Sequence, residues 1–268
     1  MNVAEPKTYA SEAAHAYWPD GRPCYNVPYK DKKRAGQMRR VTITDIRELK
    51  LIPSSTTILK VMAQPGLAYW TKTQIAKAAF DLRPGDSETQ DEWVDAVLEK
   101  AEKNMSVARD KGSEIHGVIE KYLGLIAVGI TPIQGIDDPN NAYIHAARRS
   151  LQEIGVFRFP WHSEKSFASP LGFAGKIDLH GEDWVVDFKS IDNLEKRFDY
   201  PDRCAQIASY LMGKFGTLEG KRGWNIAIGT NEPGTYKIRE WSPDELAYGW
   251  KLFSACKTLW GVINRYET

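Results

Sequence analysis

Hydrophobic and polar positions follow two different rhythms along the chain. Before about residue 155, apolar side chains recur at intervals of three and four, the spacing of one helix face. The strongest such stripe consists of Ile115, Val118, Ile119, Tyr122, Leu123 and Ile126. This stripe predicts a helix from about Ser106 to Gly129. Further helices are expected over residues 56–62, 67–80, from 91 onward, and 140–154.

After Gly155 the chain changes to short segments rich in β-branched and aromatic residues, which are typical of strands. Three of these segments predict consecutive antiparallel strands over residues 161–168, 172–180 and 183–189. A second strand pair is expected over residues 224–229 and 235–241. Two more helices are expected, one over residues 201–215 with proline at its first position, and one from the capping sequence Ser242-Pro243-Asp244-Glu245 to about residue 266.

The order of these elements predicts an α/β fold in which helices flank a central mixed β-sheet. Residues 106–268 would form this core. Residues 1–105 look irregular or helical, with short strands near 24–29 and 40–44 and a helix capped by Ser54 or Ser55. We expect this N-terminal region to pack on the core and to contribute to a binding channel.

Composition narrows the class of protein. Hydrophobic residues make up 42% and charged residues 26% of the 268 residues, which is ordinary for a globular protein and argues against wholesale disorder. The 36 basic and 35 acidic side chains nearly cancel, unlike those of a protein that coats nucleic acid non-specifically. The charges are unevenly placed, however. Residues 29–50 hold eight basic and three acidic residues, whereas residues 81–102 hold eight acidic and two basic ones.

Several features of the chain favour a cytoplasmic protein. It has no apolar run long enough for a membrane span and no apolar signal core near its start, and its first residues read poorly as a mitochondrial transit peptide. Its three cysteines, Cys24, Cys204 and Cys256, are widely spaced, which favours free thiols in a reducing compartment. The chain has no Cys-x-x-Cys pair for a structural zinc ion.

Two carboxylates and a lysine come together in the predicted sheet. Asp187 and Lys189 are two residues apart on one expected strand, so their side chains point to the same face. A tight turn at residues 181–182 would set Asp178 of the preceding strand beside Asp187. Converging carboxylates suit a hard cation such as Mg²⁺ or Mn²⁺, and the lysine suits a phosphate or a water nucleophile. Taken alone, the pattern also fits two surface carboxylates with a partnering lysine.

The neighbouring residues complete a longer pattern. In chain order it reads Gly112-x-x-x-His116, Glu164, Asp178, Asp187-x-Lys189, Ser190 and Gln206-x-x-x-Tyr210. This set resembles the active-site signature of the PD-(D/E)XK nuclease superfamily, in its RecB-like branch, over about residues 106–230. A weaker match, Pro53-Ser54-Ser55-Thr56-Thr57 followed by Tyr69-Trp70, resembles a segment of the mitochondrial genome-maintenance exonucleases and related phage and bacterial exonucleases, with Ser55 where valine is usual.

The resemblance implies a restriction-endonuclease-like core and a metal-dependent nuclease. His116, Asp178, Asp187 and the backbone carbonyl of Phe188 would hold Mg²⁺ or Mn²⁺. Glu164 would bind a second ion, a metal-bound water, or neither. Lys189 would position the attacking water or stabilise charge on the phosphate. No iron–sulfur cluster is expected, because relatives that carry one need four cysteines.

The expected substrate is DNA, single-stranded or with free ends, in recombination, replication or repair within a bacterium or a phage-infected cell. By the resemblance, Ser190, Gln206 and Tyr210 would contact this substrate or support the site. Trp70 and Lys72 follow the Pro65-Gly66 break, where they could stack a base and hold a phosphate, the usual grip on a single strand.

The favoured interpretation is an exonuclease, and three alternatives stay open. A structure-specific endonuclease that cuts flaps or junctions would use the same site, because the channel sets direction and end requirement. A non-catalytic DNA-binding module on a nuclease fold belongs to a different class, against which the intact Asp178, Asp187 and Lys189 argue. A carboxylate enzyme acting on a small phosphoester is the third.

Overall fold

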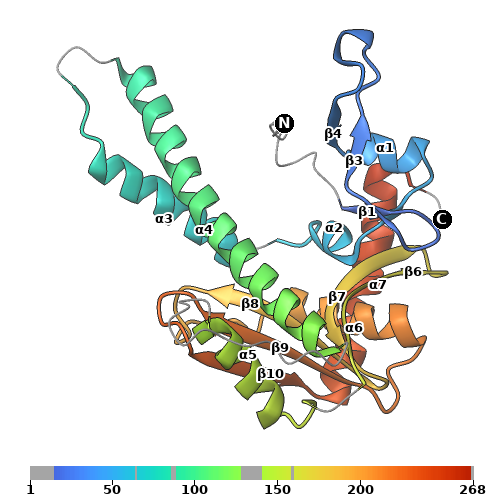
Figure 1. Cartoon of the computed structure of the whole chain (residues 1–268). Coiled ribbons are helices and arrows are strands. Elements are labelled where there is room, and N and C mark those ends of the chain that lie inside the picture. The colour runs from blue at the N-terminus through green and yellow to red at the C-terminus, as the bar shows by residue number, and fades with distance from the viewer. Residues whose placement is uncertain (1–14, 64, 86–88, 128–140, 158–159, 267–268) are drawn as a thin grey trace.

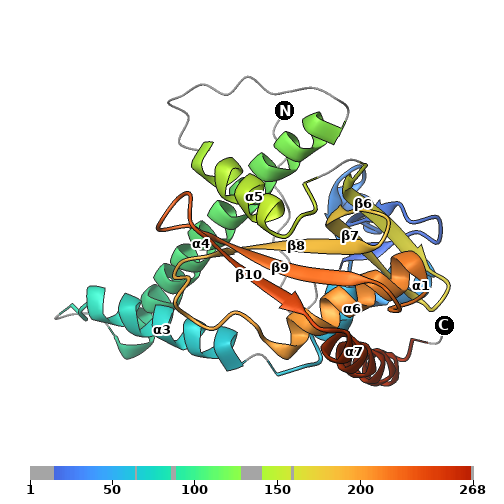
Figure 2. The same ribbon diagram turned by 90° about the horizontal axis from the view of Figure 1, so that it is seen from below.

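A five-stranded mixed β-sheet with helices on both faces forms the centre of the molecule (Figures 1 and 2). The computed structural model describes residues 15–63, 65–85, 89–127, 141–157 and 160–266. The strands of the sheet are β6 (His162–Ser169), β7 (Phe173–His180), β8 (Trp184–Ile191), β9 (Arg222–Gly229) and β10 (Tyr236–Trp241). Their order across the sheet is β10-β9-β8-β7-β6.

Only the β8–β9 pair of this sheet is parallel; β6–β7, β7–β8 and β9–β10 are antiparallel. The parallel pair arises because helix α6 (Pro201–Phe215) connects the two strands and gives the chain the length it needs to return to the same end of the sheet. The three consecutive antiparallel strands and the later pair were predicted from the sequence, and the mixed α/β fold is confirmed. The restriction-endonuclease-like character of the core stays a prediction.

Helices cover the two faces of the sheet as two separate layers. Helix α6 and helix α7 (Pro243–Asn264) lie on one face, where Phe173, Ile177 and Val185 join their core. The C-terminal part of helix α4 (Gln90–Ala127) and helix α5 (Asn141–Glu153) lie on the other face. Figure 2 shows the sheet between the α5 side and the α6–α7 side.

The N-terminal region packs on the α6–α7 face. Its elements are β1 (Ala16–Tyr17), β2 (Pro23–Cys24), β3 (Asn26–Pro28), the 3₁₀ turn η1 (Lys32–Arg34), β4 (Met38–Arg40), α1 (Ile43–Glu48), β5 (Ile52–Pro53), α2 (Ser55–Leu59) and α3 (Pro65–Asp81). The hydroxyl of Ser54 accepts a hydrogen bond from the Thr57 amide at 3.0 Å and so caps α2. The Ser55 hydroxyl donates to the Ala174 carbonyl of β7 at 3.3 Å. This region is therefore joined to the central sheet beside the start of β7.

Helices α3 and α4 form a hairpin that projects from the body of the molecule (Figure 1). The prediction of a helix starting near Ser106 is wrong, because α4 begins at Gln90 and continues unbroken to Ala127. The proposed border between residues 105 and 106 therefore falls inside one helix. A small cluster of Ala78, Val97 and Ala101, which no sequence pattern marked as a core, holds the outer part of the hairpin together. The expected helix end at Gly129 lies outside the described residues.

Helix boundaries in the C-terminal half follow the local signals. Pro201 opens α6, and Gly216, with φ +73°, ends it in the left-handed conformation that glycine adopts readily. Ser242 and Glu245 form the expected capping box of α7. The thiols of Cys24, Cys204 and Cys256 are buried and free. None of the helices in the described ranges combines the length and the apolar character needed to cross a membrane.

We expect Phe173→Ala to lower the free energy of unfolding by about 3–5 kcal/mol, because the substitution leaves a cavity where the fully buried ring meets Phe253 and Phe167. Phe80→Ala is the matched control, since the Phe80 ring is 80% exposed on α3. It should change stability by less than about 0.5 kcal/mol. Urea unfolding of both variants measures this, and equal losses would contradict the assigned core.

Candidate active site

A fork between β7 and β8 brings the two predicted carboxylates together. The two strands pair only at Leu179 with Val186 and at His180 with Val185, and then they diverge. Asp178 and Asp187 are the next residue on each strand, at the point where the fork opens. The Phe188 amide, which has no strand partner on this side, donates a hydrogen bond to Asp178 Oδ2 at 2.8 Å. At the fork, a side-chain carboxylate therefore accepts the hydrogen bond that a backbone carbonyl would accept in a continuous β-ladder.

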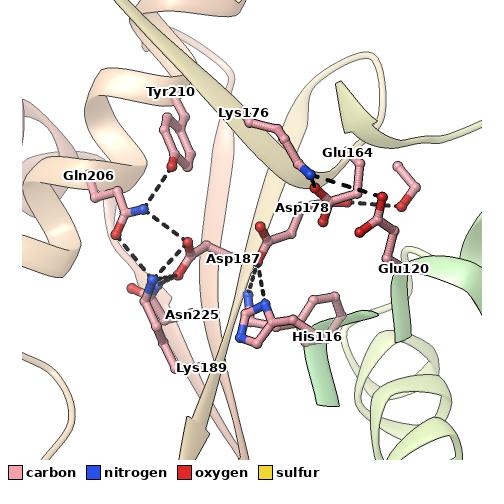
Figure 3. Close-up of polar contacts among 12 residues, drawn as sticks. His116, Glu120, Glu164, Lys176, Asp178, Asp187, Lys189, Gln206, Tyr210 and Asn225 are labelled. Atoms are coloured by element: carbon pink, nitrogen blue, oxygen red, sulfur yellow. Dashed lines mark hydrogen bonds and ion pairs between the residues drawn. The ribbon is translucent and has the colours of Figure 1, made fainter. Parts of the chain in front are cut away.

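Asp187 is held by three neighbours, from its own strand, from α6 and from β9 (Figure 3). Lys189 Nζ lies 3.0 Å from Oδ1 and 2.8 Å from Oδ2. Gln206 Nε2 donates to Oδ1 at 3.1 Å, and Asn225 Nδ2 donates to Oδ2 at 2.8 Å. The Asp187 residue is 2% exposed, so these donors replace the water that its charge has lost. The predicted shared face of Asp187 and Lys189 is present.

Gln206 and Tyr210 support Asp187 from α6. Gln206 Nε2 also donates to the Tyr210 hydroxyl at 2.8 Å, and Gln206 Oε1 accepts from Lys189 Nζ at 3.3 Å. The two residues are 7% and 4% exposed, so neither has a free surface on which a base could stack. Gln206 therefore contacts the Asp187 carboxylate directly and Tyr210 supports it through Gln206, while a contact of either with substrate stays a prediction. Gly175 makes room for Tyr210, since a Cβ at that position would lie 2.8 Å from its ring.

Asp178 faces α4 on the other side of the fork. His116 Nδ1 lies 3.8 Å from Asp178 Oδ2, which is beyond hydrogen-bond distance. Burial, helped by the positive charge of Lys189, lowers the pKa of His116, so the ring is neutral near pH 7 and able to ligate a cation. Gly112 allows α4 to approach β8, because a Cβ there would lie 2.8 Å from Ser190 Oγ. This explains the glycine of the Gly-x-x-x-His pattern.

Burial raises the pKa of Asp178 to about 7, and the negative charge of Asp187 adds to the shift. Two buried carboxylates side by side favour a proton or another cation between them. Lys189, the Phe188 amide and Lys176 oppose the shift. Asp178 is therefore the group in the fork that a bound cation would stabilise most.

Glu164 lies opposite Asp178 in a strained part of β6. Ser163 pairs with Leu179 and Lys165 with Ile177, which leaves Glu164 facing Asp178 between them. Its φ of +55° is unusual for a non-glycine strand residue. The Glu164 carboxylate forms an ion pair with Lys176, whose Nζ also lies 4.0 Å from Glu120 Oε1 (Figure 3). A cavity of about 10 Å³, room for one water, lies among His116, Glu120, Glu164, Asp178 and their apolar neighbours.

The donor chemistry of the fork suits a hard cation. Asp178 and Asp187 supply carboxylate oxygens, and the Phe188 carbonyl lies on the same side of β8 as its amide, toward Asp178. As the side chains stand, however, no three His, Cys, Asp or Glu residues of the described chain are arranged as a metal site. Figure 3 shows that the ammonium groups of Lys189 and Lys176 lie against the carboxylates of Asp187 and Glu164.

Several predicted substrate residues lie apart from the fork. Trp70 and Lys72 are on α3 in the projecting hairpin, and they make no polar contact with the site residues in the parts of the chain that are described. Ser190 lies beside Gly112 on the open arm of β8. Within residues 29–50, Lys30 pairs with Glu48, Arg34 with Asp31 and Arg39 with Asp45, so part of the basic charge is neutralised inside the segment.

Four residues of the site were missed from the sequence: Glu120, Lys176, Arg203 and Asn225. Asn225 is fully buried and connects Asp187 to Trp241. Its Nδ2 donates to Asp187, and its Oδ1 accepts from Trp241 Nε1 at 2.8 Å. A polar residue in the apolar run Trp224–Gly229 was the available signal. Glu120 follows His116 by one helical turn, and this spacing alone predicts that the two side chains share a helix face. Lys176 lies two residues before Asp178 on one strand, and Arg203 lies three residues before Gln206 on one helix, so their spacing also placed them on the same faces as these residues.

The chain was compared with known proteins by sequence and by structure. No family model and no curated protein matches it. Among solved structures, an alkaline exonuclease from Laribacter hongkongensis is similar over 57% of this chain and 89% of its own, with 14% identity and a TM-score of 0.33. At that TM-score the likeness establishes neither a shared fold nor a shared activity.

The raised pKa of Asp178 predicts a pH-dependent loss of stability. The unfolded chain releases this proton near the ordinary aspartate pKa of 3.8, whereas the folded protein keeps it up to about 7. Between these values the native state binds more protons, so stability falls as pH rises, by up to about 1 kcal/mol per pH unit. Below pH 3.8 Asp178 is protonated in both states and costs no stability. Above about pH 7 it is ionised in both states, and the loss of stability no longer changes with pH.

Asp178→Asn should remove this dependence, so its stability relative to the wild type should increase from pH 5 to pH 7. Urea unfolding in EDTA at several pH values measures the difference. Asp183→Asn, at an exposed turn carboxylate paired with Arg222, is the control and should follow the wild type. Parallel curves for wild type and Asp178→Asn would contradict the assignment.

Proposed function

We propose that the protein is a metal-dependent deoxyribonuclease that hydrolyses phosphodiester bonds, most readily as an exonuclease on single-stranded DNA or DNA with free ends. The observation that carries the proposal is the meeting of Asp178, Asp187 and Lys189 in the fork, with Asp187 fixed by Gln206 and Asn225. These are the residue types, in the chain order, of the signature that the sequence resembles.

The fixed carboxylate supports a catalytic rather than a merely structural site. Asp187 is buried with four hydrogen-bonding contacts, so it is oriented before any substrate arrives. A charge kept inside a protein at the cost of desolvation is weak evidence for stability and is common at functional sites. The raised pKa of Asp178 beside it has the same origin.

Mg²⁺ or Mn²⁺ at this site would lower the pKa of a water and offset the charge of the scissile phosphate. In the proposal Asp178, Asp187 and the Phe188 carbonyl hold that ion, and His116 approaches it as a neutral ligand. Lys189, whose side chain is 27% exposed, directs its ammonium group at the attacking water or at a phosphate oxygen. Glu164 shapes the far side of the small cavity, where its carboxylate is neutralised by Lys176.

Asp187→Ala should reduce Mg²⁺-dependent cleavage of a labelled oligonucleotide at least about 100-fold, because it removes the group that Lys189, Gln206 and Asn225 orient. DNA affinity measured in EDTA should stay within a few-fold of the wild type. Asp183→Ala is the matched control at the exposed start of β8 and should cleave normally. Cleavage by Asp187→Ala at the wild-type rate would overturn the site, provided that thermal unfolding shows both variants folded.

The mode of cleavage needs a separate experiment. Linear single- and double-stranded substrates carry a label at one end or the other, and a covalently closed circle is included. An exonuclease releases mononucleotides or short oligomers from the linear strands and leaves the circle intact. Cutting of the circle, or of an internal flap or junction, would instead establish the structure-specific endonuclease. A small aryl phosphodiester tests for the carboxylate enzyme that acts on small phosphoesters. Such an enzyme would hydrolyse it and show no salt-sensitive affinity for DNA.

A further inference from the structure

Arg203 lies on the same face of α6 as the two residues that support Asp187. Arg203, Gln206 and Tyr210 are spaced at i, i+3 and i+7, which places them along one helix stripe facing the fork. Arg203 belongs to the first turn of α6, where helix amides also favour negative charge. It is close enough to Asp187 for the two charges to interact. The sequence pattern assigns no role to this arginine.

The guanidinium of Arg203 is held by aromatic rings. Its central carbon lies 5.7 Å from the centroid of the Phe198 ring and 5.7 Å from that of Tyr200. Its Nη1 atom is buried and has no hydrogen-bond partner within the described residues. In the same part of the structure no carboxylate forms an ion pair with it, although Asp187, Asp199 and Asp202 are near enough to influence its charge.

Several other arginines are paired with a carboxylate. Arg22, Arg39, Arg197 and Arg239 each form an ion pair with a carboxylate. A buried donor without a partner is costly, and burial lowers the pKa of Arg203 as further evidence of that cost. Two aromatic rings border the guanidinium, and its planar fork of donors suits an oxyanion.

Two further cations lie near the rings that border Arg203. Lys237 Nζ lies 5.8 Å from the Phe198 ring centroid, and the Arg197 guanidinium lies 5.5 Å from that of Tyr200. Arg197 is paired with Asp199, and Lys237 Nζ donates to the Leu194 carbonyl at 3.1 Å, so we assign a phosphate to neither of them. Asp199 and Asp202 moderate this charge but leave Arg203 without an ion pair.

We propose that Arg203 binds a backbone phosphodiester of the DNA substrate, next to the bond held at Asp178 and Asp187. The inference rests on the proposed function and adds to it a phosphate subsite formed by the first turn of α6, with Phe198 and Tyr200 as its walls. Lys189 serves the reacting phosphate, and Arg203 fixes the position of a neighbouring one.

The test measures binding of a fluorescent single-stranded oligonucleotide to the full chain in EDTA, over a range of salt concentrations. Arg203→Gln should weaken binding about tenfold at low salt. It should also lower the slope of log affinity against log salt by about 0.7, the value for one lost phosphate contact. A role in packing alone changes thermal stability and leaves this slope unchanged.

Arg197→Gln is the matched control, because Arg197 also lies against Tyr200 but is exposed and paired with Asp199. It should keep the wild-type slope. Arg203→Lys, which retains the charge, should keep the slope and recover part of the affinity. Arg203→Gln with the affinity and slope of the wild type overturns the subsite.

A second measurement does not need the glutamine variant to fold. Neutral methylphosphonate replaces one linkage of the oligonucleotide at a time. In the wild type one linkage should cost more affinity than its neighbours, and in Arg203→Lys that cost should shrink. An identical profile in the two proteins overturns the subsite.

Cleavage by the wild type in Mg²⁺ is scored separately. If the wild type cleaves DNA while the Arg203 variants bind normally, the subsite fails and the nuclease proposal stands. If the wild type neither cleaves nor binds DNA, both fail together.

Discussion

The charge of Asp187 is the constraint around which the centre of this protein is arranged. A carboxylate that is 2% exposed has lost its water, and the loss must be made good by donors that no single element can supply. Lys189 comes from the same strand, Gln206 from α6 and Asn225 from β9. Gln206 and Asn225 thereby fix α6 and β9 relative to β8. Trp241 then holds Asn225, so the same network reaches the edge strand β10.

The fork between β7 and β8 is the second part of this arrangement. A continuous antiparallel ladder would satisfy the Phe188 amide with a backbone carbonyl, and Asp178 would be an ordinary strand residue. Because the strands diverge after Leu179 and Val186, the Asp178 carboxylate accepts the hydrogen bond from the Phe188 amide, and its side chain lies in the gap between the strands. The close approaches at Gly112 and Gly175 allow α4 and Tyr210 to fill the sides of the gap. The N-terminal region, through Ser55 and Ala174, supports β7 from outside the fork.

Sequence reasoning recovered those parts of the fold whose signals are local. The strands β6 to β10, the proline start of α6 and the capping box of α7 each depend on neighbouring residues, and they lie within about two residues of the predicted positions. The full length of α4 was missed because its outer half has no continuous apolar stripe and only Val97 and Ala101 are buried there. The fork was missed because strand divergence is a tertiary property. Asp178, Asp187, Lys189 and Gln206 could be grouped by resemblance, whereas Lys176 and Arg203 fall outside that resemblance and were not assigned to the site.

Helix α4 passes through two environments within one unbroken hydrogen-bonded backbone. Its inner half buries Ile115, Ile119, Tyr122 and Leu123 against the sheet, whereas its outer half has only the small cluster with Ala78 to hold it. The free energy of local opening should therefore decline gradually along the helix from the sheet toward the tip of the hairpin. The start of α4 near Gln90 can therefore open locally while His116 keeps its position beside Asp178.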